Sequence, residues 1–374
     1  MGELPRREAS ALQRRVIHPA VFAALRTAML PIHAAPPPEV VRVAGGLGAW
    51  FGSLKLNRKR VDRAVDRLEV AMPELDRPAR ARLVNESYAH LCRLAVEIAL
   101  APRVLTESGW PESLDLGTLP RAIPATFRDR PVLFVSGHCG NWEMIGSAVA
   151  LLGYPMHALY RPLDLAPLDK WVRRLRERRG LMLVDKFGAA KTLPGLLKRG
   201  ESLGFVADQN AGDRGMFVPF FGRLASTYKT IALLAIQYNA SVVVGQALRT
   251  GQGSGEQAAG QRPSTTGLSY RMHVEDVIGP EDWQGQPDPA FYLTARYRLA
   301  IERMVRAAPE QYLWMHRIWK SRPRHERAAA GFPPRLREKL EQLPWMTAAG
   351  VDAIVDRSDR DTRWLRDQGT DRLP

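Results

Sequence analysis

The stretch that decides the fold is PVLFVSGHCGNWEMIGSAVALLG, residues 131–153. Its first part, PVLFVSG, is a short apolar run followed by glycine, which predicts a buried β-strand. Its second part, NWEMIGSAVALLG, predicts a helix that ends at Gly153. His138 falls between the two, and Glu143 falls in the first turn of the helix. On one ideal helix two residues five apart point about 140° away from each other, so this pair can meet only because the chain turns between them.

The same alternation continues beyond this stretch. Further strands are expected at 156–163, 181–186, 202–210 and 241–249, and further helices at 168–180, 189–200 and 226–240. Residues 268–277 alternate like the return strand of a hairpin, and an amphipathic helix follows at 289–309. Strands that alternate with helices indicate βαβ units. We therefore predict an α/β fold, with a mostly parallel central sheet flanked by helices and a helical N-terminal arm that associates with a membrane.

We expect three parts along the chain. Residues 1–57 are expected to form a membrane-associating segment, and residues 58–323 the main domain, with a helical lead-in over 58–130 and the α/β core over 131–323. Two helices are expected between 58 and 100, separated by prolines. Residues 324–374 are charged and weakly periodic, which predicts an appendage of short helices, partly disordered. Within the core, residues 251–267 form a low-complexity loop.

The composition points to an anionic partner. The 374 residues carry a formal net charge of +15 and only two cysteines. The cysteines give no disulfide framework or metal cluster, and a reducing compartment is their simplest setting. A basic excess of this size is typical of proteins that meet a membrane surface, a nucleic acid or an acidic protein. The sequence contains no zinc-finger spacing and no aromatic-basic RNA-binding signature.

Two apolar segments raise the question of a membrane span. The longest charge-free run, residues 230–248, is broken by YNAS and predicts a helix, a turn and a buried strand. The apolar segment 16–54 is interrupted by charges and prolines, so an in-plane or re-entrant segment is expected there. GGLGAWFGSL is its most insertable part, and the basic KLNRKR follows at 55–60. No cleavable signal is evident at the start of the sequence.

His138 is the strongest candidate for chemistry. It follows a strand at the carboxyl edge of the predicted sheet, where ligand sites lie in open α/β sheets. A histidine oriented by the carboxylate of Glu143 would be a general base that takes a proton from a hydroxyl. The alternative is a buried structural histidine. Cys139 points to the opposite side on an extended chain, which disfavours a Cys-His nucleophile, and neither G-x-S-x-G nor H-E-x-x-H occurs.

Four sequence blocks, in order, resemble one known family. SGHCGNWEMIG resembles the H-x-x-x-x-[DE] box of the lysophospholipid-type acyltransferases, and its GH-x-GNWE form resembles that of the bacterial lipid A late acyltransferases, the lauroyl and myristoyl transferases. ALYRPLD, FVADQNAGDRGMFVPFFGRLAST and PEQYLWMHRIWKSRP resemble later blocks of that family. The likeness spans roughly residues 25 to 323.

This resemblance implies transfer of a fatty acyl group from an acyl thioester to a hydroxyl of a membrane glycolipid, a lipid A precursor in the first instance. His138 would be the general base. Glu143 would fix the tautomer of its ring and stabilise the imidazolium, as the carboxylate does in a hydrolase triad. Asn141, with the free amides of the helix N-terminus, would help to hold the oxyanion.

Three further residues of the matched blocks are candidates for substrate binding. Arg161 is a candidate clamp for a phosphate, because its fork pairs with phosphate through two hydrogen bonds. Asp208 is expected at another strand end, where it would orient either Arg161 or His138. Gln209 lies next to it in the D-Q block.

The resemblance also implies partners and a location. The donor is expected to be acyl-acyl carrier protein, which is acidic where this chain is basic, with acyl-CoA as the alternative. The expected setting is the cytoplasmic face of a bacterial inner membrane, with peripheral or monotopic attachment. No cofactor and no metal ion are needed. Alternatives are another acceptor (a phosphatidylinositol mannoside, an ornithine lipid or another glycolipid), a thioesterase, or a non-catalytic basic module that binds a membrane or nucleic acid.

Overall fold

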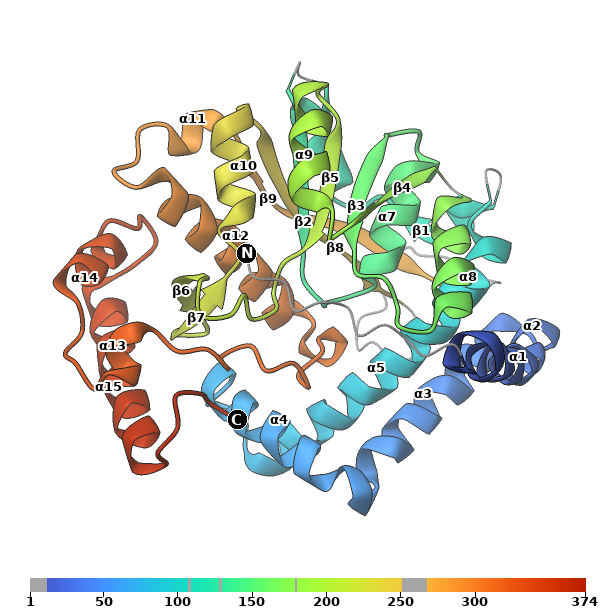
Figure 1. The fold of residues 1–374 in the computed structure, drawn as a ribbon, viewed down its shortest axis with the longest axis horizontal. Coiled ribbons are helices and arrows are strands. Elements are labelled where there is room, and N and C mark those ends of the chain that lie inside the picture. Colours follow the sequence, from blue (N-terminus) through green and yellow to red (C-terminus); the bar gives the residue numbers. More distant parts are fainter. Residues whose placement is uncertain (1–11, 107–108, 128–129, 179, 251–267) are drawn as a thin grey trace.

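A computed structural model describes residues 12–106, 109–127, 130–178, 180–250 and 268–374. The low-complexity loop expected at 251–267 lies outside these residues. The described parts form one central sheet with helices on both faces, and long helices gather along one end of the sheet (Figure 1).

The central sheet has seven strands in the order β1-β9-β8-β2-β5-β3-β4. Its strands are β1 (Leu114–Asp115), β2 (Val132–Ser136), β3 (Met156–Tyr160), β4 (Leu181–Asp185), β5 (Ser202–Val206), β8 (Ser241–Arg249) and β9 (Tyr270–Ile278). The five strands from β8 to β4 are mutually parallel, and β9 returns antiparallel to β8. This confirms the mostly parallel sheet and the hairpin return at 268–277.

Every residue of β2 is buried, because helices cover both faces of the sheet. Leu133 and Val135 point into a core that α9, α10 and α12 complete, whereas Val132 and Phe134 point into a core that α6 and α7 complete. A strand buried on both faces has no polar face, which explains its continuous apolar run. The helices within and after this part of the chain are α6 (Ile123–Thr126), α7 (Trp142–Leu151), α8 (Ala166–Glu177), α9 (Ala189–Lys198), α10 (Thr230–Tyr238), α11 (Pro280–Trp283) and α12 (Pro289–Ala307).

Helices α4 (Arg58–Ala71) and α5 (Arg77–Val104) confirm the two helices expected between residues 58 and 100. Asp76 caps α5 through a hydrogen bond from the amide of Ala79 to its carboxylate, and Pro78 occupies the first turn, where a missing amide hydrogen costs nothing. The charge-free run at 230–248 is also as expected, since it holds α10, a left-handed turn at Asn239 and most of β8.

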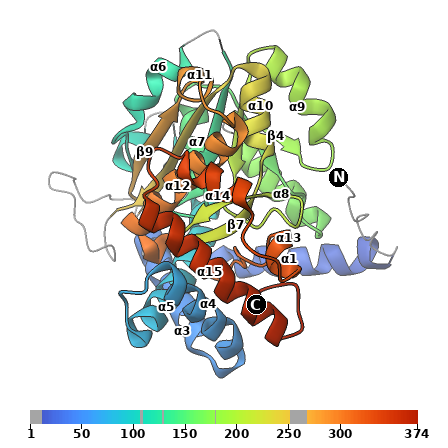
Figure 2. The same ribbon diagram turned by 90° about the vertical axis from the view of Figure 1, so that its left-hand side faces the viewer.

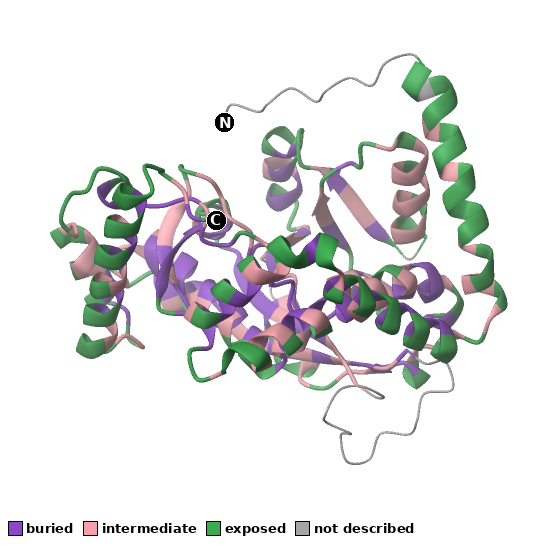
Figure 3. Cartoon of the chain, turned by 90° about the horizontal axis from the view of Figure 1, so that it is seen from below, coloured by how far each residue is buried: buried purple, intermediate pink, exposed green. Residues whose placement is uncertain are grey.

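The N-terminal arm consists of α1 (His18–Ala28), α2 (Leu30–Ala34) and α3 (Pro37–Ser53). Within the described residues, the continuous helical stretch Arg15–Ala34 is the one stretch long and apolar enough to cross a membrane, judged by length and composition alone. None of its apolar window is buried against the rest of the protein, and Figure 3 shows this helix exposed along nearly its whole length.

Helix α3 behaves differently from the rest of the arm, because it packs along α5. Gly45, Gly48 and Gly52 lie in the contact, where a Cβ at Gly48 would come within 2.4 Å of the backbone oxygen of Tyr88. Three of the four glycines of GGLGAWFGSL therefore lie against α5, where they let the two helices approach closely, whereas Gly46 is exposed. Insertion of this stretch into a membrane stays a prediction, and it applies to the face of α3 that is turned away from α5. Only the opposite face of α3 remains open to solvent.

A second, two-stranded sheet was not predicted. Strands β6 (Met216–Phe220) and β7 (Arg223–Thr227) form an antiparallel hairpin whose turn holds Phe221 and Gly222, both with positive φ. Phe220 and Phe221 are buried in the main core, which agrees with a packing role for them.

The appendage contains α13 (Arg324–Arg327), α14 (Pro334–Glu341) and α15 (Ala348–Asp367), which face the viewer in Figure 2. The partial disorder expected here is wrong, because a buried ionic network fixes these helices to the hairpin. Asp361 of α15 accepts hydrogen bonds from Arg223 at 2.7 Å and Arg322 at 2.9 Å, and Arg322 also donates to Glu326 at 2.6 Å. Such networks leave little periodic apolar signal in a sequence.

Candidate active site

Three candidate residues follow neighbouring parallel strands. His138 comes two residues after β2, Asp208 two residues after β5, and Arg161 directly after β3. Because β2, β5 and β3 are adjacent and parallel, their carboxyl ends meet at one edge of the sheet. The strand order thus brings together residues that lie far apart in the sequence.

His138 is hydrogen-bonded to Asp208. Its Nδ1 lies 2.6 Å from Oδ1 of Asp208, and the carboxylate is completely buried, whereas 16% of the His138 side chain is exposed. Burial alone disfavours the imidazolium, but the charge of Asp208, its hydrogen bond and the nearby charge of Glu143 together raise the pKa of His138 above its ordinary value. This contact fixes the tautomer that leaves Nε2 free to accept a proton.

Asp208 stays ionised in spite of its burial. Burial acts to raise the pKa of this carboxyl, but the positive charges of His138 and Arg298, the His138 hydrogen bond and His316 hold it well below its usual range. A buried carboxylate bonded to the inner nitrogen of a histidine is the arrangement that orients the ring and stabilises the imidazolium in acyl transfer.

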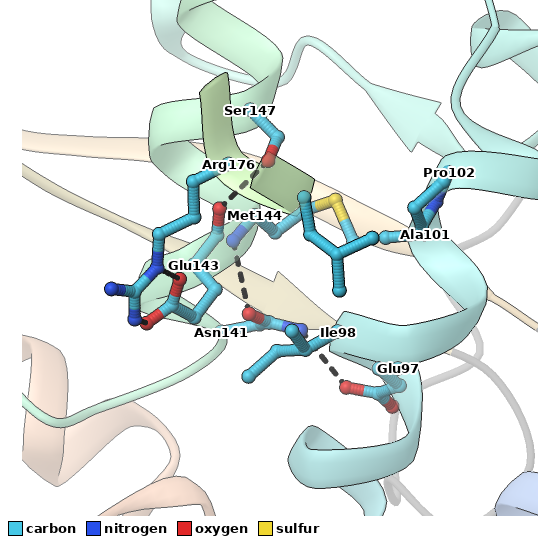
Figure 4. A pocket seen from close by; sticks show the side chains of 10 residues that line it. Glu97, Ile98, Ala101, Pro102, Asn141, Glu143, Met144, Ser147 and Arg176 are labelled. Atoms are coloured by element: carbon cyan, nitrogen blue, oxygen red, sulfur yellow. Dashed lines mark hydrogen bonds and ion pairs between the residues drawn. The ribbon is translucent and has the colours of Figure 1, made fainter. Parts of the chain in front are cut away.

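Glu143 does not make the contact that the sequence predicted. Its carboxylate forms a two-pronged ion pair with Arg176 of α8, with oxygen–nitrogen distances of 2.8 and 2.5 Å (Figure 4). The prediction that Glu143 fixes the His138 ring is therefore corrected. Asp208 makes that contact instead, which is one of the two roles that the sequence suggested for Asp208. The physical reason is that β5, next to β2, delivers a carboxylate directly behind the histidine.

Asn141 is also assigned differently. Its side-chain oxygen accepts the amide hydrogen of Met144 and so caps α7, while its nitrogen donates to Glu97 at 2.9 Å and to the hydroxyl of Tyr270 at 3.1 Å (Figure 4). The side chain is 1% exposed. Because these groups are already used inside the protein, the predicted contact with an oxyanion is corrected to a structural role.

A small pocket lies beside this corner of the site. It opens between α5, α7 and α8, with the Glu143–Arg176 pair on its wall and Ile98, Met144 and Leu175 as apolar lining (Figure 4). Counting its solvent-open part, it has an empty volume of about 340 Å³.

Gln209 and His316 lie beside the ring of His138. The side-chain nitrogen of Gln209 lies 3.4 Å from Nε2 of His138, and the ring of His316 lies 4.6 Å from the His138 ring, centre to centre. Burial and the neighbouring charge of His138 lower the pKa of His316 to about 4, so this second ring is neutral at physiological pH. The structure thus places Gln209 beside His138, and its role in substrate binding stays a prediction.

His316 and Arg298 are site residues that sequence reasoning missed. His316 belongs to a block that resembled the family, but nothing in its spacing from His138 signals the contact. Arg298 is fully buried, donates to the carbonyl of Ala207 at 3.2 Å and has its guanidinium 3.8 Å from the centre of the Phe220 ring. On a helix rich in arginine, one inward-pointing arginine carries no distinguishing sequence signal.

Arg161 is exposed at the same edge of the sheet. Within the described part of the chain its guanidinium has no hydrogen bond or ion pair, in contrast to Arg176. Cys139 is buried, which raises the pKa of its thiol and rules against a thiolate nucleophile.

Comparison with known proteins finds one family along most of the chain. A family profile for bacterial lipid A biosynthesis acyltransferase matches residues 11–321. The chain is 29% identical over 288 residues to the lipid A biosynthesis palmitoleoyltransferase of Escherichia coli (strain K12), covering 74% of this chain and 85% of that protein. It is 26% identical over 300 residues to the lipid A biosynthesis lauroyltransferase of the same strain, covering 77% and 87%.

Proposed function

The chain belongs to the bacterial lipid A biosynthesis acyltransferase family, and from this premise we propose that it transfers a fatty acyl group from an acyl thioester to a hydroxyl of a lipid A precursor, with His138 as the general base. It is an O-acyltransferase by family. The observation that supports the choice of base is the 2.6 Å contact between His138 and the buried carboxylate of Asp208.

In this mechanism Nε2 of His138 removes the proton of the acceptor hydroxyl as its oxygen attacks the thioester carbonyl. The new C–O bond gives a tetrahedral intermediate, which collapses with cleavage of the C–S bond. The imidazolium then returns its proton to the departing thiolate. Asp208 stabilises the imidazolium throughout, and general base catalysis of this kind contributes about 10²–10⁴-fold in rate.

Gln209 and Arg161 are proposed to contact substrate. Gln209 lies next to the nitrogen that receives the proton, so its amide can position the acceptor hydroxyl. Arg161 lies at the same edge of the sheet with its guanidinium exposed, as a clamp for a phosphate of the acceptor requires. The ion pair between Glu143 and Arg176 holds the first turn of α7 against α8, and the charge of Glu143 helps to raise the pKa of His138.

For the donor we propose acyl-acyl carrier protein, because the net charge of +15 favours an acidic partner over a neutral one. For the location we propose the cytoplasmic face of a bacterial inner membrane. The exposed helix Arg15–Ala34 supports attachment, as do the exposed basic residues that follow α3 and begin α4, which are Lys55, Arg58, Lys59 and Arg60.

Purified protein tests this proposal. Radiolabelled acyl-acyl carrier protein and acyl-CoA are supplied in turn, each with a tetra-acylated or penta-acylated lipid A precursor in detergent micelles. Wild type is expected to acylate the precursor, and His138→Ala is expected to lose about 10²–10⁴-fold in rate with an unchanged circular dichroism spectrum.

Three outcomes would contradict parts of the proposal. Free fatty acid released without acceptor would indicate a thioesterase, and acylation of a mannoside or an ornithine lipid in place of the precursor would change the acceptor. Turnover by folded His138→Ala within tenfold of wild type would exclude His138 as the base.

A further inference from the structure

Residues 372–374 contact two loops that carry residues of the active site, although the family match ends at residue 321. After α15, residues 372–374 run back past α4 and contact two separate loops. We call residues 372–374 the strap. One contacted loop, residues 312–321, is the closing loop, and the other, residues 207–215, is the Asp208 loop.

The strap is bonded to the closing loop through the backbone. The amide of Leu373 donates to the carbonyl of Lys320 at 3.1 Å, and Arg372 forms a β-bridge with Ser321. In the other direction, the guanidinium of Arg317 donates to the carbonyl of Leu373 at 3.1 Å. The Leu373 side chain is buried in the main core.

Arg67 of α4 ties the strap and the closing loop to the lead-in helices. One nitrogen of its nearly buried guanidinium donates to the carbonyl of Trp314 at 3.2 Å, and another donates to the carbonyl of Pro374 at 3.3 Å. A single arginine therefore joins the strap to the loop that places His316 beside His138.

The strap also holds the Asp208 loop. The guanidinium of Arg372 forms an ion pair with Asp213 at 3.1 Å. The two loops are joined to each other by Asn210 and Ser321, with a side-chain contact of 3.2 Å and an amide-to-side-chain contact of 3.1 Å.

Both loops set the position of His138. The Asp208 loop supplies its carboxylate partner and Gln209, and the closing loop supplies His316 and an amide, that of Leu313, which donates to the His138 carbonyl at 3.1 Å. A catalytic base displaced by about 1 Å can lose about 10²-fold in rate. A segment that holds both loops in place can therefore change the reaction rate without contacting the substrate.

We propose that residues 372–374 are a positioning element for catalysis, which clamps the closing loop and the Asp208 loop together and so keeps His138, Asp208 and Gln209 in register. This proposal rests on the proposed function only for its effect on rate, because the clamping itself is measurable in protein that is not turning over.

The test uses charge reversal in the full-length protein. Arg372→Asp places two carboxylates together, whereas the double variant Arg372→Asp with Asp213→Arg restores the pair in reverse. Arg366→Asp is the matched control, since Arg366 is an exposed arginine of α15 whose described partner is its neighbour Asp367. Amide hydrogen exchange is measured by mass spectrometry over both loops, alongside kcat, KM and thermal unfolding.

We expect Arg372→Asp to speed exchange in residues 207–215 and 312–321 and to lower kcat about fivefold with little change in KM, as loss of an exposed ion pair allows. The double variant should recover both properties, and Arg366→Asp should change neither. Deleting residues 372–374 should lower kcat by about ten- to a hundredfold. The deletion also removes the buried side chain of Leu373. If the shortened protein does not fold, the charge-reversal variants still test the proposal.

Equal exchange in Arg372→Asp and Arg366→Asp, or no recovery in the double variant, would overturn the proposal. If wild type shows no acyl transfer but Arg372→Asp loosens both loops, the proposed function fails and the clamp stands. If transfer is normal and the loops do not respond, the clamp fails and the proposed function stands.

Discussion

At the scale of single residues, two carboxylates lie near His138 and only one is bonded to it. Asp208 contacts Nδ1, while Glu143 is held by Arg176. We expect Asp208→Asn to lower kcat about 10²-fold or more, because an amide can present its NH₂ group to the ring and favour the wrong tautomer. Glu143→Gln should cost much less, and Arg176→Ala should match it. Single-turnover rates of the three variants check this ranking, and a Glu143→Gln defect larger than that of Asp208→Asn would contradict it.

The pH dependence of the same pair is a second prediction. The raised pKa of His138 means that its base form is lost below a pH that lies above 6.5, its ordinary value. We expect kcat/KM to rise with pH through this point. In Asp208→Asn the imidazolium loses its partner while burial still disfavours it, so the rise should move to lower pH. A profile of kcat/KM from pH 5 to 9 measures the rise in wild type and in the variant. If the rise occurs at the same pH in both proteins, a group other than His138 titrates.

The sequence pointed to His138 as the base but preferred Glu143 over Asp208 as its partner, for a geometric reason. His138 is identified by a short motif that includes its own strand and helix. Its bond to Asp208 spans 70 positions and exists because β5 was placed next to β2. Strand order is a property of the whole sheet, and no local pattern encodes it. Helical spacing predicted that Glu143 needs a turn in the chain to reach His138. It does not reveal that Arg176, on another helix, binds the carboxylate of Glu143 instead.

At the scale of elements, the helices and the central-sheet strands between 131 and 249 were predicted closely, because a doubly covered sheet produces sharp apolar runs bounded by glycines. The β6–β7 hairpin was missed for the opposite reason. Its turn uses Phe221 at φ 52°, a conformation that a bulky residue adopts only when its surroundings fix it. The ion pair between Arg223 and Asp361 likewise depends on a helix that lies 138 positions away.

The glycine face of α3 gives a prediction at this scale. At Gly48 an added Cβ would meet the backbone of Tyr88 at 2.4 Å, whereas at Gly46 it would meet nothing within 4 Å. We expect Gly48→Ala to destabilise the protein by about 1–3 kcal/mol, as overpacking does. Gly46→Ala should be neutral or stabilise by up to about 1 kcal/mol, since alanine is the better helix former. Thermal unfolding in one detergent compares the two, and equal melting temperatures would mean that α3 does not pack tightly on α5.

At the scale of the whole molecule, the exposed apolar residues gather on the N-terminal arm. Along the arm, Val16, Ile17, Val21, Leu25 and Leu30 are exposed on α1 and its flanks. On α3 the exposed apolar side chains are Val43, Leu47, Trp50 and Phe51. The first three are spaced four and three apart and so lie on one face, opposite Gly45, Gly48 and Gly52. A soluble surface rarely leaves so much apolar area uncovered, and basic residues follow directly.

This distribution separates two contributions to membrane binding. Helix Arg15–Ala34 contacts little of the fold, so its removal should leave the protein folded, whereas removal of α3 would uncover α5. We expect deletion of residues 1–34 to shift the protein strongly toward the soluble fraction while His138-dependent transfer to a micellar acceptor persists. Residual binding to anionic vesicles should remain and should fall with salt, because each basic residue near such a surface contributes about 1 kcal/mol.

Flotation with vesicles of neutral or anionic lipid, at low and high salt, measures these contributions separately. In the truncated protein, Leu47→Ser with Trp50→Ser should remove most of the remaining binding, while the matched change Leu340→Ser, inside the core, should instead lower the melting temperature. Truncated protein that still floats fully on neutral vesicles would show that α1 is not the anchor. Full-length protein that ignores anionic vesicles at low salt would contradict the surface-binding proposal itself, since both the apolar arm and the charge of +15 favour that surface.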